Sequence, residues 1–281
     1  MSAATVLTHQ RPDQTAHALG TMLAAARDAG VTLRFDAEET RKHGLRPAEG
    51  LELDAPISNE VAVCVVLGGD GTILRALRQY AGTRVPVFAV NFGEVGFLAT
   101  VDPDGVVDGL RRAFCGGFET LHMPALAVDT PAGTQMAIND VSIHRKVGER
   151  VAQLAYVVGE EEVGSVRCDG LVVATPAGST GYNLANGGPV LAWGVEGYVV
   201  SFIAPHSLTA RALVVAPDDV LRVHNRSDSA VEVAVDGRPA GELGPGEAIT
   251  ARFARETAQL AFVEGSSFYR RLREKFGRLA R

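Results

Sequence analysis

The segment Gly68-Gly69-Asp70-Gly71-Thr72 combines three glycines with a carboxylate and a hydroxyl. It follows the apolar run 61–67 and precedes the amphipathic stretch 73–78, a pattern that predicts a buried strand, a tight turn and the start of a helix. Such a turn directs free backbone N–H groups and the positive end of a helix dipole at a ligand, and glycine lets a phosphate approach closely. Because a carboxylate repels phosphate, Asp70 needs an acid-base or metal-linked task. The segment predicts a phosphate site with a reactive group, and a plain Asp-Gly turn is the alternative.

A second candidate loop, Asn91–Leu98, directly follows the apolar run 85–90. In an open α/β sheet, ligands lie beyond the carboxyl ends of the strands. We therefore expect this loop and the Asp70 turn to share one crevice. An ordinary β-turn remains the alternative for this segment taken alone.

Two polar segments lie further along the chain. Asn139-Asp140 interrupts an apolar alternation, and two adjacent polar side chains can bond to a pair of ribose hydroxyls, although a β-bulge gives the same pattern. In segment 168–182, an apolar strand ends in small residues, hydroxyls and one aromatic ring. Small residues let a flat ring lie against the backbone, while Tyr182 offers a stacking face and Thr180 a hydroxyl. Asp169 can accept a hydrogen bond from a ligand. Segment 168–182 therefore predicts a ligand site.

The elements that must position these residues differ between the two halves of the chain. Strands are expected at 4–8, 31–35, 61–67 and 85–90, alternating with helices at 13–29, 73–78 and 104–114, which predicts a parallel sheet covered on both faces. Residues 37–56 read as a surface connection with a fragment of helix. From residue 118 to about 264, short alternating runs bounded by glycine predict an all-β domain with a turn or two of helix around Leu184.

The predicted architecture thus has an α/β domain over residues 1–117 and an all-β domain over 118–266. The basic stretch 267–281 has helical spacing, and we expect it to pack back onto the first domain. Asp236-Gly237 fits a hairpin turn, with a reach to a neighbouring site as the further alternative.

Composition excludes several classes of partner. A chain of 281 residues with net charge −6 lacks the basic face that nucleic-acid binding needs. The three cysteines have no Cys-x-x-Cys spacing, and no histidines pair at metal-ligand spacing, so we assign no metal-ligating residue and expect His206 to be structural. The sequence shows no signal-peptide pattern and no membrane-length apolar run. We predict a cytoplasmic protein with no membrane partner.

These segments together resemble the NAD kinases in order and approximate spacing over nearly the whole chain. The Gly-Gly-Asp-Gly-Thr turn alone is shared with 6-phosphofructokinases and with diacylglycerol and sphingosine kinases. The loop Thr175-Pro176-Ala177-Gly178-Ser179-Thr180-Gly181-Tyr182 is what makes the resemblance specific to the NAD kinases. Pro205-His206-Ser207-Leu208 and the tail that begins at Phe268 agree with it. The resemblance implies transfer of the γ-phosphoryl of ATP to the 2′-hydroxyl of the adenosine ribose of NAD, with Mg²⁺.

The resemblance also implies roles for individual residues. Asp70 would accept the proton of the 2′-hydroxyl, and Asp169 would meet the nicotinamide end. Asn139 and Asp140 would hold ribose hydroxyls. The other residues implied in dinucleotide and phosphate binding are Gly68, Gly69, Gly71, Thr72, Arg75, Asn91, Phe92, Arg150, Arg167, Thr180, Gly181, Tyr182, Asn183, Leu184, Ala185 and Ala204. Members of the family are commonly dimers or tetramers, and inorganic polyphosphate stays open beside ATP as the donor.

The chain departs from the family pattern at a few positions. Gly181 stands where family members often carry Ala, which loosens the adenine loop, and Asp140 replaces a commoner Glu. Two other functions share some of these features. A lipid kinase would need a membrane-facing surface, and a catalytically idle dinucleotide-binding regulator would have little use for Asp70.

Overall fold

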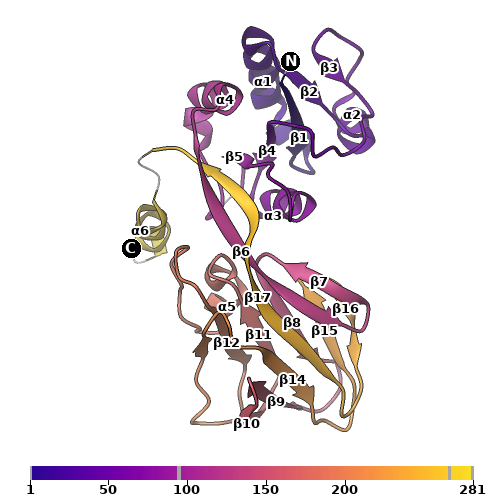
Figure 1. The fold of residues 1–281 in the computed structure, drawn as a ribbon, viewed down its shortest axis with the longest axis vertical. Coiled ribbons are helices and arrows are strands. Elements are labelled where there is room, and N and C mark those ends of the chain that lie inside the picture. Colours follow the sequence, from indigo (N-terminus) through magenta and orange to yellow (C-terminus); the bar gives the residue numbers. More distant parts are fainter. Residues whose placement is uncertain (1, 94–95, 265–266, 280–281) are drawn as a thin grey trace. The chain divides into compact units, whose positions relative to one another are not determined.

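The computed structural model describes residues 2–93, 96–264 and 267–279. The chain divides into two compact units, Met1–His122 with Thr257–Arg281 and Met123–Glu256. We refer to them as the first and the second unit. Two long strands, β6 (Glu119–Thr130) and β17 (Ala248–Phe262), run from one unit into the other (Figure 1).

The first unit is built on a parallel sheet. Its strands are β1 (Ala3–Thr8), β2 (Thr32–Arg34), β3 (Leu51–Glu52), β4 (Val63–Gly68) and β5 (Val87–Asn91). They lie in the order β5-β4-β1-β2-β3, all parallel, and the last part of β17 joins at the β5 edge. The carboxyl ends of β1, β4 and β5 therefore meet at one edge of the sheet.

Helices cover both faces of this sheet. They are α1 (Ala16–Ala29), α2 (Ala37–His43), α3 (Asp70–Gln79) and α4 (Val106–Cys115). A further helix, α6 (Phe268–Leu279), follows β17, and one-turn helices lie at Pro12–Gln14 and Pro103–Gly105. Successive strand side chains alternate between faces. Val63, Val65 and Leu67 pack with α1 and α4 in one core, whereas Tyr80, just after α3, donates a hydrogen bond to Thr5 on the other face (2.8 Å). Figure 1 shows α1 and α4 on one side and α3 on the other.

The second unit consists of two antiparallel layers. One is the sheet β13-β12-β11-β8-β15-β16, and the other has the order β10-β9-β14-β17. The core between them is formed by the inward residues of both, such as Val141 and Val173 from one layer and Leu154 and Val223 from the other. The strands are β7 (Gly133–Ala137), β8 (Asp140–Arg145), β9 (Ala152–Val158), β10 (Glu161–Cys168), β11 (Gly170–Ala174), β12 (Tyr198–Ile203), β13 (Leu213–Val215), β14 (Leu221–Asn225), β15 (Val231–Val235) and β16 (Arg238–Leu243).

The structure confirms the predicted parallel sheet and the all-β character of the second half. The predicted turn of helix near Leu184 is present as α5 (Tyr182–Ala185), after a one-turn helix at Gly178–Thr180. Asp236 and Gly237 form a two-residue hairpin turn between β15 and β16, both with positive φ (47° and 71°), as predicted. Residues 37–56 contain the expected helix fragment, α2, but also strand β3, which the sequence pattern did not reveal.

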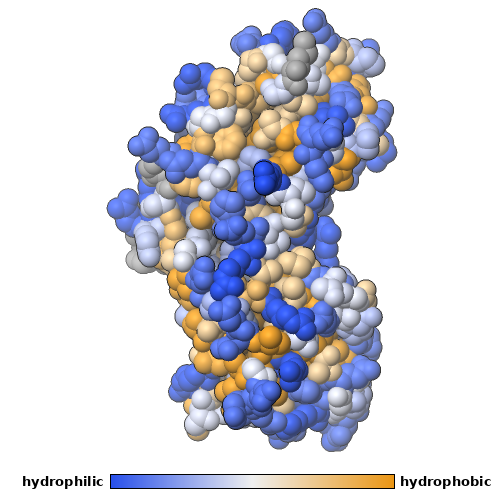
Figure 2. Space-filling model, in the orientation of Figure 1, coloured by the Kyte–Doolittle hydropathy of each residue, from blue (hydrophilic) through white to orange (hydrophobic). Residues whose placement is uncertain are grey.

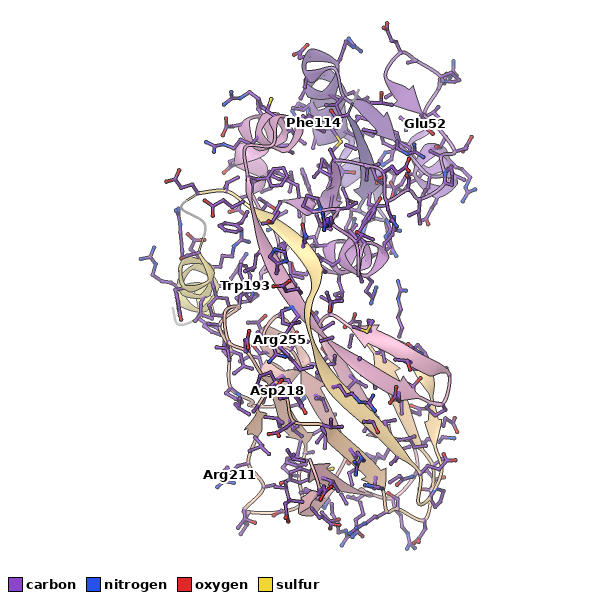
Figure 3. The ribbon with its side chains drawn as sticks, viewed as in Figure 1. Glu52, Phe114, Trp193, Arg211, Asp218 and Arg255 are labelled. Carbon is purple, nitrogen blue, oxygen red and sulfur yellow. The ribbon has the colours of Figure 1, made fainter. Side chains whose placement is uncertain are left out.

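The surface is mixed in character. On the face in Figure 2, hydrophilic residues are interspersed with apolar ones over both units. Exposed ion pairs are part of this surface; Arg255 of β17, for example, bonds to Asp218 (3.0 Å) beside it in Figure 3. Within the described ranges, no helix has the length and apolar character needed to cross a membrane. Cys64, Cys115 and Cys168 are all free thiols.

Candidate functional site

Asp70 lies at the junction of β4 and α3 in the first unit. Gly68 ends β4, Gly69 caps α3 and Asp70 is the first residue of the helix. The two carboxylate oxygens of Asp70 accept hydrogen bonds from the backbone N–H groups of Phe97 (3.0 Å) and Leu98 (3.2 Å). A carboxylate at a helix N-terminus is also stabilised by the helix dipole. Because each oxygen has two lone pairs, Asp70 can still accept a proton from a ligand.

The surroundings of Asp70 act on its pKa in opposite directions. Burial raises the pKa above the usual value for Asp, while the two backbone N–H groups and the charges of Arg271 and Lys275 lower it. The net direction is upward. A raised pKa makes Asp70 a stronger base than an exposed aspartate.

Glycines let the loops after β4 and β5 touch. A Cβ on Gly69 would lie 3.1 Å from the Cα of Gly93, and one on Gly93 would lie 2.8 Å from the Cα of Gly69. Asn91 fixes the second loop, since its Oδ1 accepts the N–H of Gly93 (3.0 Å). The two loops therefore share one edge of the sheet, as predicted, with Phe92 half-buried beside them. Glu94 and Val95 of the predicted loop lie outside the described residues.

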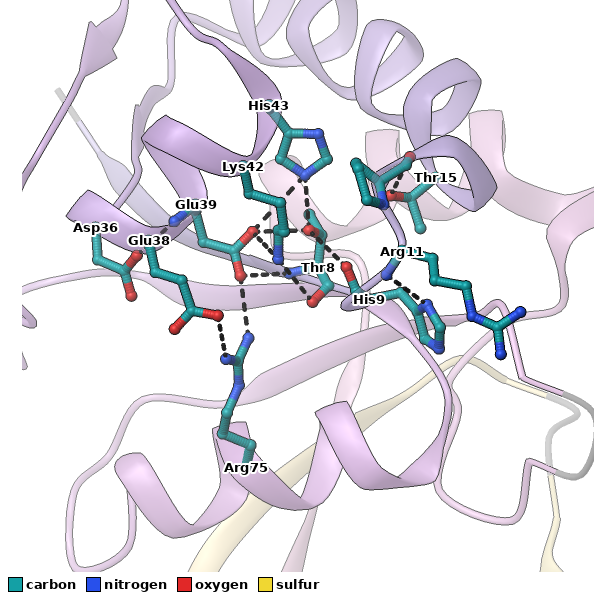
Figure 4. A network of polar contacts seen from close by, with 11 residues as sticks. Thr8, His9, Arg11, Thr15, Asp36, Glu38, Glu39, Lys42, His43 and Arg75 are labelled. Atoms are coloured by element: carbon teal, nitrogen blue, oxygen red, sulfur yellow. Dashed lines mark hydrogen bonds and ion pairs between the residues drawn. The ribbon is translucent and has the colours of Figure 1, made fainter.

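Arg75 points to a buried acidic residue of the same unit. Its guanidinium bonds to Glu39 (3.0 Å) and approaches Glu38 (3.7 Å), as Figure 4 shows. Glu39 is fully buried and also accepts hydrogen bonds from the backbone N–H (3.0 Å) and hydroxyl (2.7 Å) of Thr8, and it pairs with Lys42 (2.7 Å). The structure thus places Arg75, which was predicted to contact the dinucleotide, in an ion pair that ties α3 to α2.

In the second unit, one carboxylate organises the Asn139-Asp140 corner. Asp236, in the hairpin turn, accepts hydrogen bonds from the backbone N–H groups of Ile138 (3.1 Å), Asn139 (2.8 Å) and Asp140 (3.1 Å). The same corner is locked to the loop after β11, because the carbonyl of Asn139 accepts the N–H of Thr175 (2.9 Å). The corner and this loop are therefore one built structure.

Asp140 is buried, with 9% of its surface exposed, and its pKa is raised to about 7 by burial and by the neighbouring charge of Asp236. Asp140, Ser142 and His144 share one face of β8 because they are two residues apart. The ring of His144 stacks on Tyr182 at a centroid distance of 5.6 Å and an interplanar angle of 16°. Among the described residues, the buried Oδ1 of Asn139 has no hydrogen-bond partner. A buried acceptor without a donor suits a ligand hydroxyl.

The loop that contains residues 180–185 is held by its own side chains. Asn183 is fully buried and its amide donates to the carbonyls of Ser179 and Pro189 (both 2.9 Å), so it closes the loop. Thr180 donates to the carbonyl of Ala177 (3.0 Å). Tyr182 is 37% exposed and presents a ring that a ligand can reach. Gly181 and Ala185 are exposed and Leu184 is half-buried.

The remaining predicted residues of the second unit lie at the ends of strands. Asp169, between β10 and β11, pairs with the Nε of Arg145 (2.6 Å), and this cation lowers the pKa of Asp169. Ala204, just after β12, has a positive φ of 43°, which is uncommon for a residue with a Cβ. Arg150 and Arg167 are exposed.

Comparisons with known proteins agree with this arrangement. Residues 13–118 match the model of the ATP-NAD kinase N-terminal domain, and residues 138–263 match that of the ATP-NAD kinase C-terminal domain. The NAD kinase of Gemmatimonas aurantiaca is 34% identical over 270 residues, which is 92% of this chain and 90% of that protein. The NAD kinase of Lachnoclostridium phytofermentans is 31% identical, covering 97% of this chain and 98% of its own length.

This chain belongs to the NAD kinase family.

Two solved structures extend the comparison. The structure of an NAD kinase from Archaeoglobus fulgidus in complex with ATP superposes with a TM-score of 0.73 at 25% identity and covers 99% of this chain and 98% of that one. Yeast NADH kinase complexed with NADH has the same fold, with a TM-score of 0.87 at 22% identity over 99% of this chain and 88% of that one.

Sequence reasoning missed several polar residues that contact the predicted ones. His144 lies in an alternating strand, an even number of positions from Asp140. That spacing places both side chains on one face of the strand and was the signal that could have identified His144. Asp236 was read chiefly as a turn residue, and its three backbone contacts come from residues about a hundred positions earlier in the chain. Arg145 and Arg271 had no local signal, because only long-range contacts bring them to Asp169 and to the Asp70 loop.

Proposed function

We propose that this chain transfers the γ-phosphoryl group of ATP to the 2′-hydroxyl of the adenosine ribose of NAD, giving NADP, with Asp70 as the general base. Membership of the NAD kinase family supports the overall reaction. The observation that carries the assignment of the base is the placement of Asp70 at the start of α3, held by two backbone N–H groups with its pKa raised by burial.

The proposed chemistry is balanced. Asp70 takes the proton of the 2′-hydroxyl while the oxygen of that hydroxyl forms a bond to the γ-phosphorus. The bond between the γ-phosphorus and the β,γ-bridging oxygen breaks, and ADP is released. Most of the catalytic effect in such transfers comes from positioning and from neutralising charge on the phosphates. The glycine turn supplies backbone N–H groups and the positive end of α3 for that purpose.

Magnesium is proposed as part of the ATP substrate. Mg²⁺ is usually held by substrate phosphates, waters and one or two carboxylates. In the part of the chain that the structure describes, no group of three His, Cys, Asp or Glu side chains is placed to hold a metal ion.

The dinucleotide is proposed to contact residues of the second unit. Asn139 and Asp140 would bond to ribose hydroxyls, which is supported by the buried Oδ1 of Asn139, to which no group in the described ranges donates a hydrogen bond. Tyr182 would offer its exposed ring to the adenine, and Asp169 would meet the nicotinamide end. The rest of the segment 180–185 would also contact the dinucleotide, as would Arg150, Arg167 and Ala204. Asn183 would act there by holding the loop.

Other parts of the function also stay proposals. Residues 1–117 with the helix in 267–281 would form the nucleotide-binding domain, and residues 118–266 the NAD-binding domain. A homodimer or homotetramer and a cytoplasmic location are proposed from the family resemblance and from the scattered cysteines. Light scattering of the purified protein would test the oligomeric state, and replacing ATP by inorganic polyphosphate in the assay would test the donor.

The deciding experiment is to incubate the purified protein with NAD, ATP and Mg²⁺ and to measure NADP with an NADP-specific dehydrogenase. NADP from the wild type and a strongly reduced rate from Asp70→Asn would support both the reaction and the base. An inactive wild type that still binds NAD in calorimetry would point to another phosphoryl donor. An inactive wild type that does not bind NAD would contradict the proposed function.

A further inference from the structure

The C-terminal helix α6 contacts the segment that holds Asp70. Arg271, in the first turn of α6, donates hydrogen bonds to the carbonyl of Phe97 (3.3 Å) and to the carbonyl of Thr100 (3.2 Å). Phe97 and Leu98 donate their backbone N–H groups to Asp70. Phe97 is therefore bonded on one side to Asp70 and on the other to Arg271.

The far end of this segment is anchored to the sheet. The hydroxyl of Thr100 donates to the carbonyl of Ala261 (2.7 Å) and accepts the N–H of Ala89 (2.9 Å), which fixes it between β17 and β5. The near end of the loop is held by the N–H of Phe92, which donates to the carbonyl of Gly68 (3.1 Å), and by the Asn91–Gly93 contact. The guanidinium of Arg271 donates one hydrogen bond to the carbonyl at each end of residues 97–100. These two bonds hold the segment in the conformation in which the N–H groups of residues 97 and 98 point to Asp70.

The same guanidinium acts on Asp70 through its charge. The charges of Arg271 and Lys275 lower the pKa of Asp70, against the larger effect of burial. Asp102, after β5, and Glu274, on α6, face Arg271 in turn. The helix dipole of α3 adds a favourable term for the ionised carboxylate. The cations of α6 therefore keep a buried base ionised at a lower pH than burial alone would allow.

We infer that Arg271 is a positioning residue for phosphoryl transfer, which fixes residues 97–100 and through them the carboxylate of Asp70. The inference rests on the proposed function, because it assumes that Asp70 is the base. It gives the basic C-terminal tail a part in the reaction without a contact to NAD. A merely structural helix would stabilise the fold but would leave the titration of the base unchanged.

The test compares two substitutions at Arg271 with a control on the same helix. Arg271→Gln removes the charge and keeps one amide donor, and Arg271→Lys keeps the charge and loses the forked donation. Arg273→Ala, at an exposed position of α6, is the control and should behave as wild type. For each protein, kcat and the KM for NAD are measured against pH, and the folded fraction at the assay temperature is measured by thermal unfolding.

Both Arg271 variants should lose about tenfold or more in kcat, because a small misplacement of a catalytic group is costly, with KM for NAD within about threefold. The acidic limb of the kcat profile should move to higher pH by about 0.5 unit or more in Arg271→Gln, because Asp70 loses a neighbouring cation. It should stay in place in Arg271→Lys.

Two results would overturn the inference in a wild type that is active. One is an acidic limb in Arg271→Gln that coincides with the wild type, and the other is a kcat within twofold of wild type once the folded fraction is taken into account. If Arg271→Gln does not fold, Arg271→Lys decides by its kcat alone. An inactive wild type would instead count against the proposed function.

Discussion

Asp70 of the first unit and Asp140 of the second are both buried aspartates next to a turn, and burial raises the pKa of each. They differ in what lies around them. Asp70 accepts two backbone N–H groups itself and faces the cations Arg271 and Lys275. At the Asp140 corner the three backbone N–H groups go to Asp236, and burial together with the neighbouring charge of Asp236 raises the pKa of Asp140 to about 7.

The difference shows how one residue type serves two purposes. Backbone donors and cations keep Asp70 available as an ionised base, which general base catalysis needs. The pKa of Asp140 is raised to about 7, and a carboxyl that carries a proton can donate a hydrogen bond as well as accept one. Such a group suits the recognition of ribose hydroxyls better than the abstraction of a proton.

The largest expected effect comes from Asp70→Asn. The amide cannot take the proton, and we expect kcat to fall by roughly 10²–10⁴ while the affinity for NAD stays within several-fold. The measurements are NADP formation and calorimetric titration with NAD. A variant that loses NAD binding but keeps its turnover rate would contradict the role of Asp70 as base.

Asp140→Asn should affect the KM for NAD more than kcat, the opposite of Asp70→Asn. In its ionised form Asp140 accepts hydrogen bonds with both oxygens, whereas the amide nitrogen of Asn only donates. Losing a hydrogen bond to a charged group costs about 1.5–3 kcal/mol, so the KM for NAD should rise about 10- to 100-fold while kcat changes by only several-fold. Steady-state kinetics at saturating ATP measure both constants. A strong fall in kcat at unchanged KM would contradict the assignment of Asp140 to NAD binding and of Asp70 alone to catalysis.

The third prediction concerns the glycines that build each region. A Cβ on Gly178 would lie 2.0 Å from the carbonyl oxygen of Asn139, whereas a Cβ on Gly71 would meet nothing within 4 Å. Gly178→Ala should therefore lower the free energy of unfolding by on the order of 1–3 kcal/mol. Gly71→Ala, in α3, should leave it unchanged or raise it by up to about 1 kcal/mol. Urea unfolding of both variants tests this, and equal stabilities would contradict the close packing of the second unit.

The smallest expected effect is on the pH dependence of stability. Because the pKa of Asp140 is higher in the folded state than in the unfolded chain, the folded protein binds more protons between about pH 4 and pH 7. This group therefore makes the free energy of unfolding fall as pH rises through that window, and its contribution is constant above it.

Asp236→Asn removes the neighbouring charge and should lower the pKa of Asp140. The fall in stability between pH 5 and pH 8 should then shrink by about 1.4 kcal/mol for each unit of pKa that is removed. Urea unfolding at both pH values measures it. Asp218→Asn, which alters an exposed ion pair with Arg255, is the control and should keep the wild-type slope. An unchanged slope in Asp236→Asn would show that burial alone raises the pKa of Asp140.

Much of the architecture could be predicted from local sequence. The apolar run before Gly68 predicted β4 and the amphipathic stretch after Thr72 predicted α3, because burial sets the spacing of apolar residues in each element. Strand β3, of two residues, was too short to show such a period. The burial of Glu39 was also missed. A carboxylate is stable inside a protein only when partners compensate its charge, and Thr8, Lys42 and Arg75 do so here through contacts made in the folded chain.

The two kinds of sheet, the Asp70 turn and the resemblance to the NAD kinases could all be predicted from the amino-acid sequence, because the residues of each motif are close together along the chain. Tertiary contacts set which hydrogen-bond donors each carboxylate receives. Asp236 reaches Asn139 across 97 positions, and Arg271 reaches Phe97 across 174. The pKa of a buried carboxyl depends on burial, nearby charges and hydrogen bonds in space, and in this protein those partners come from distant parts of the chain.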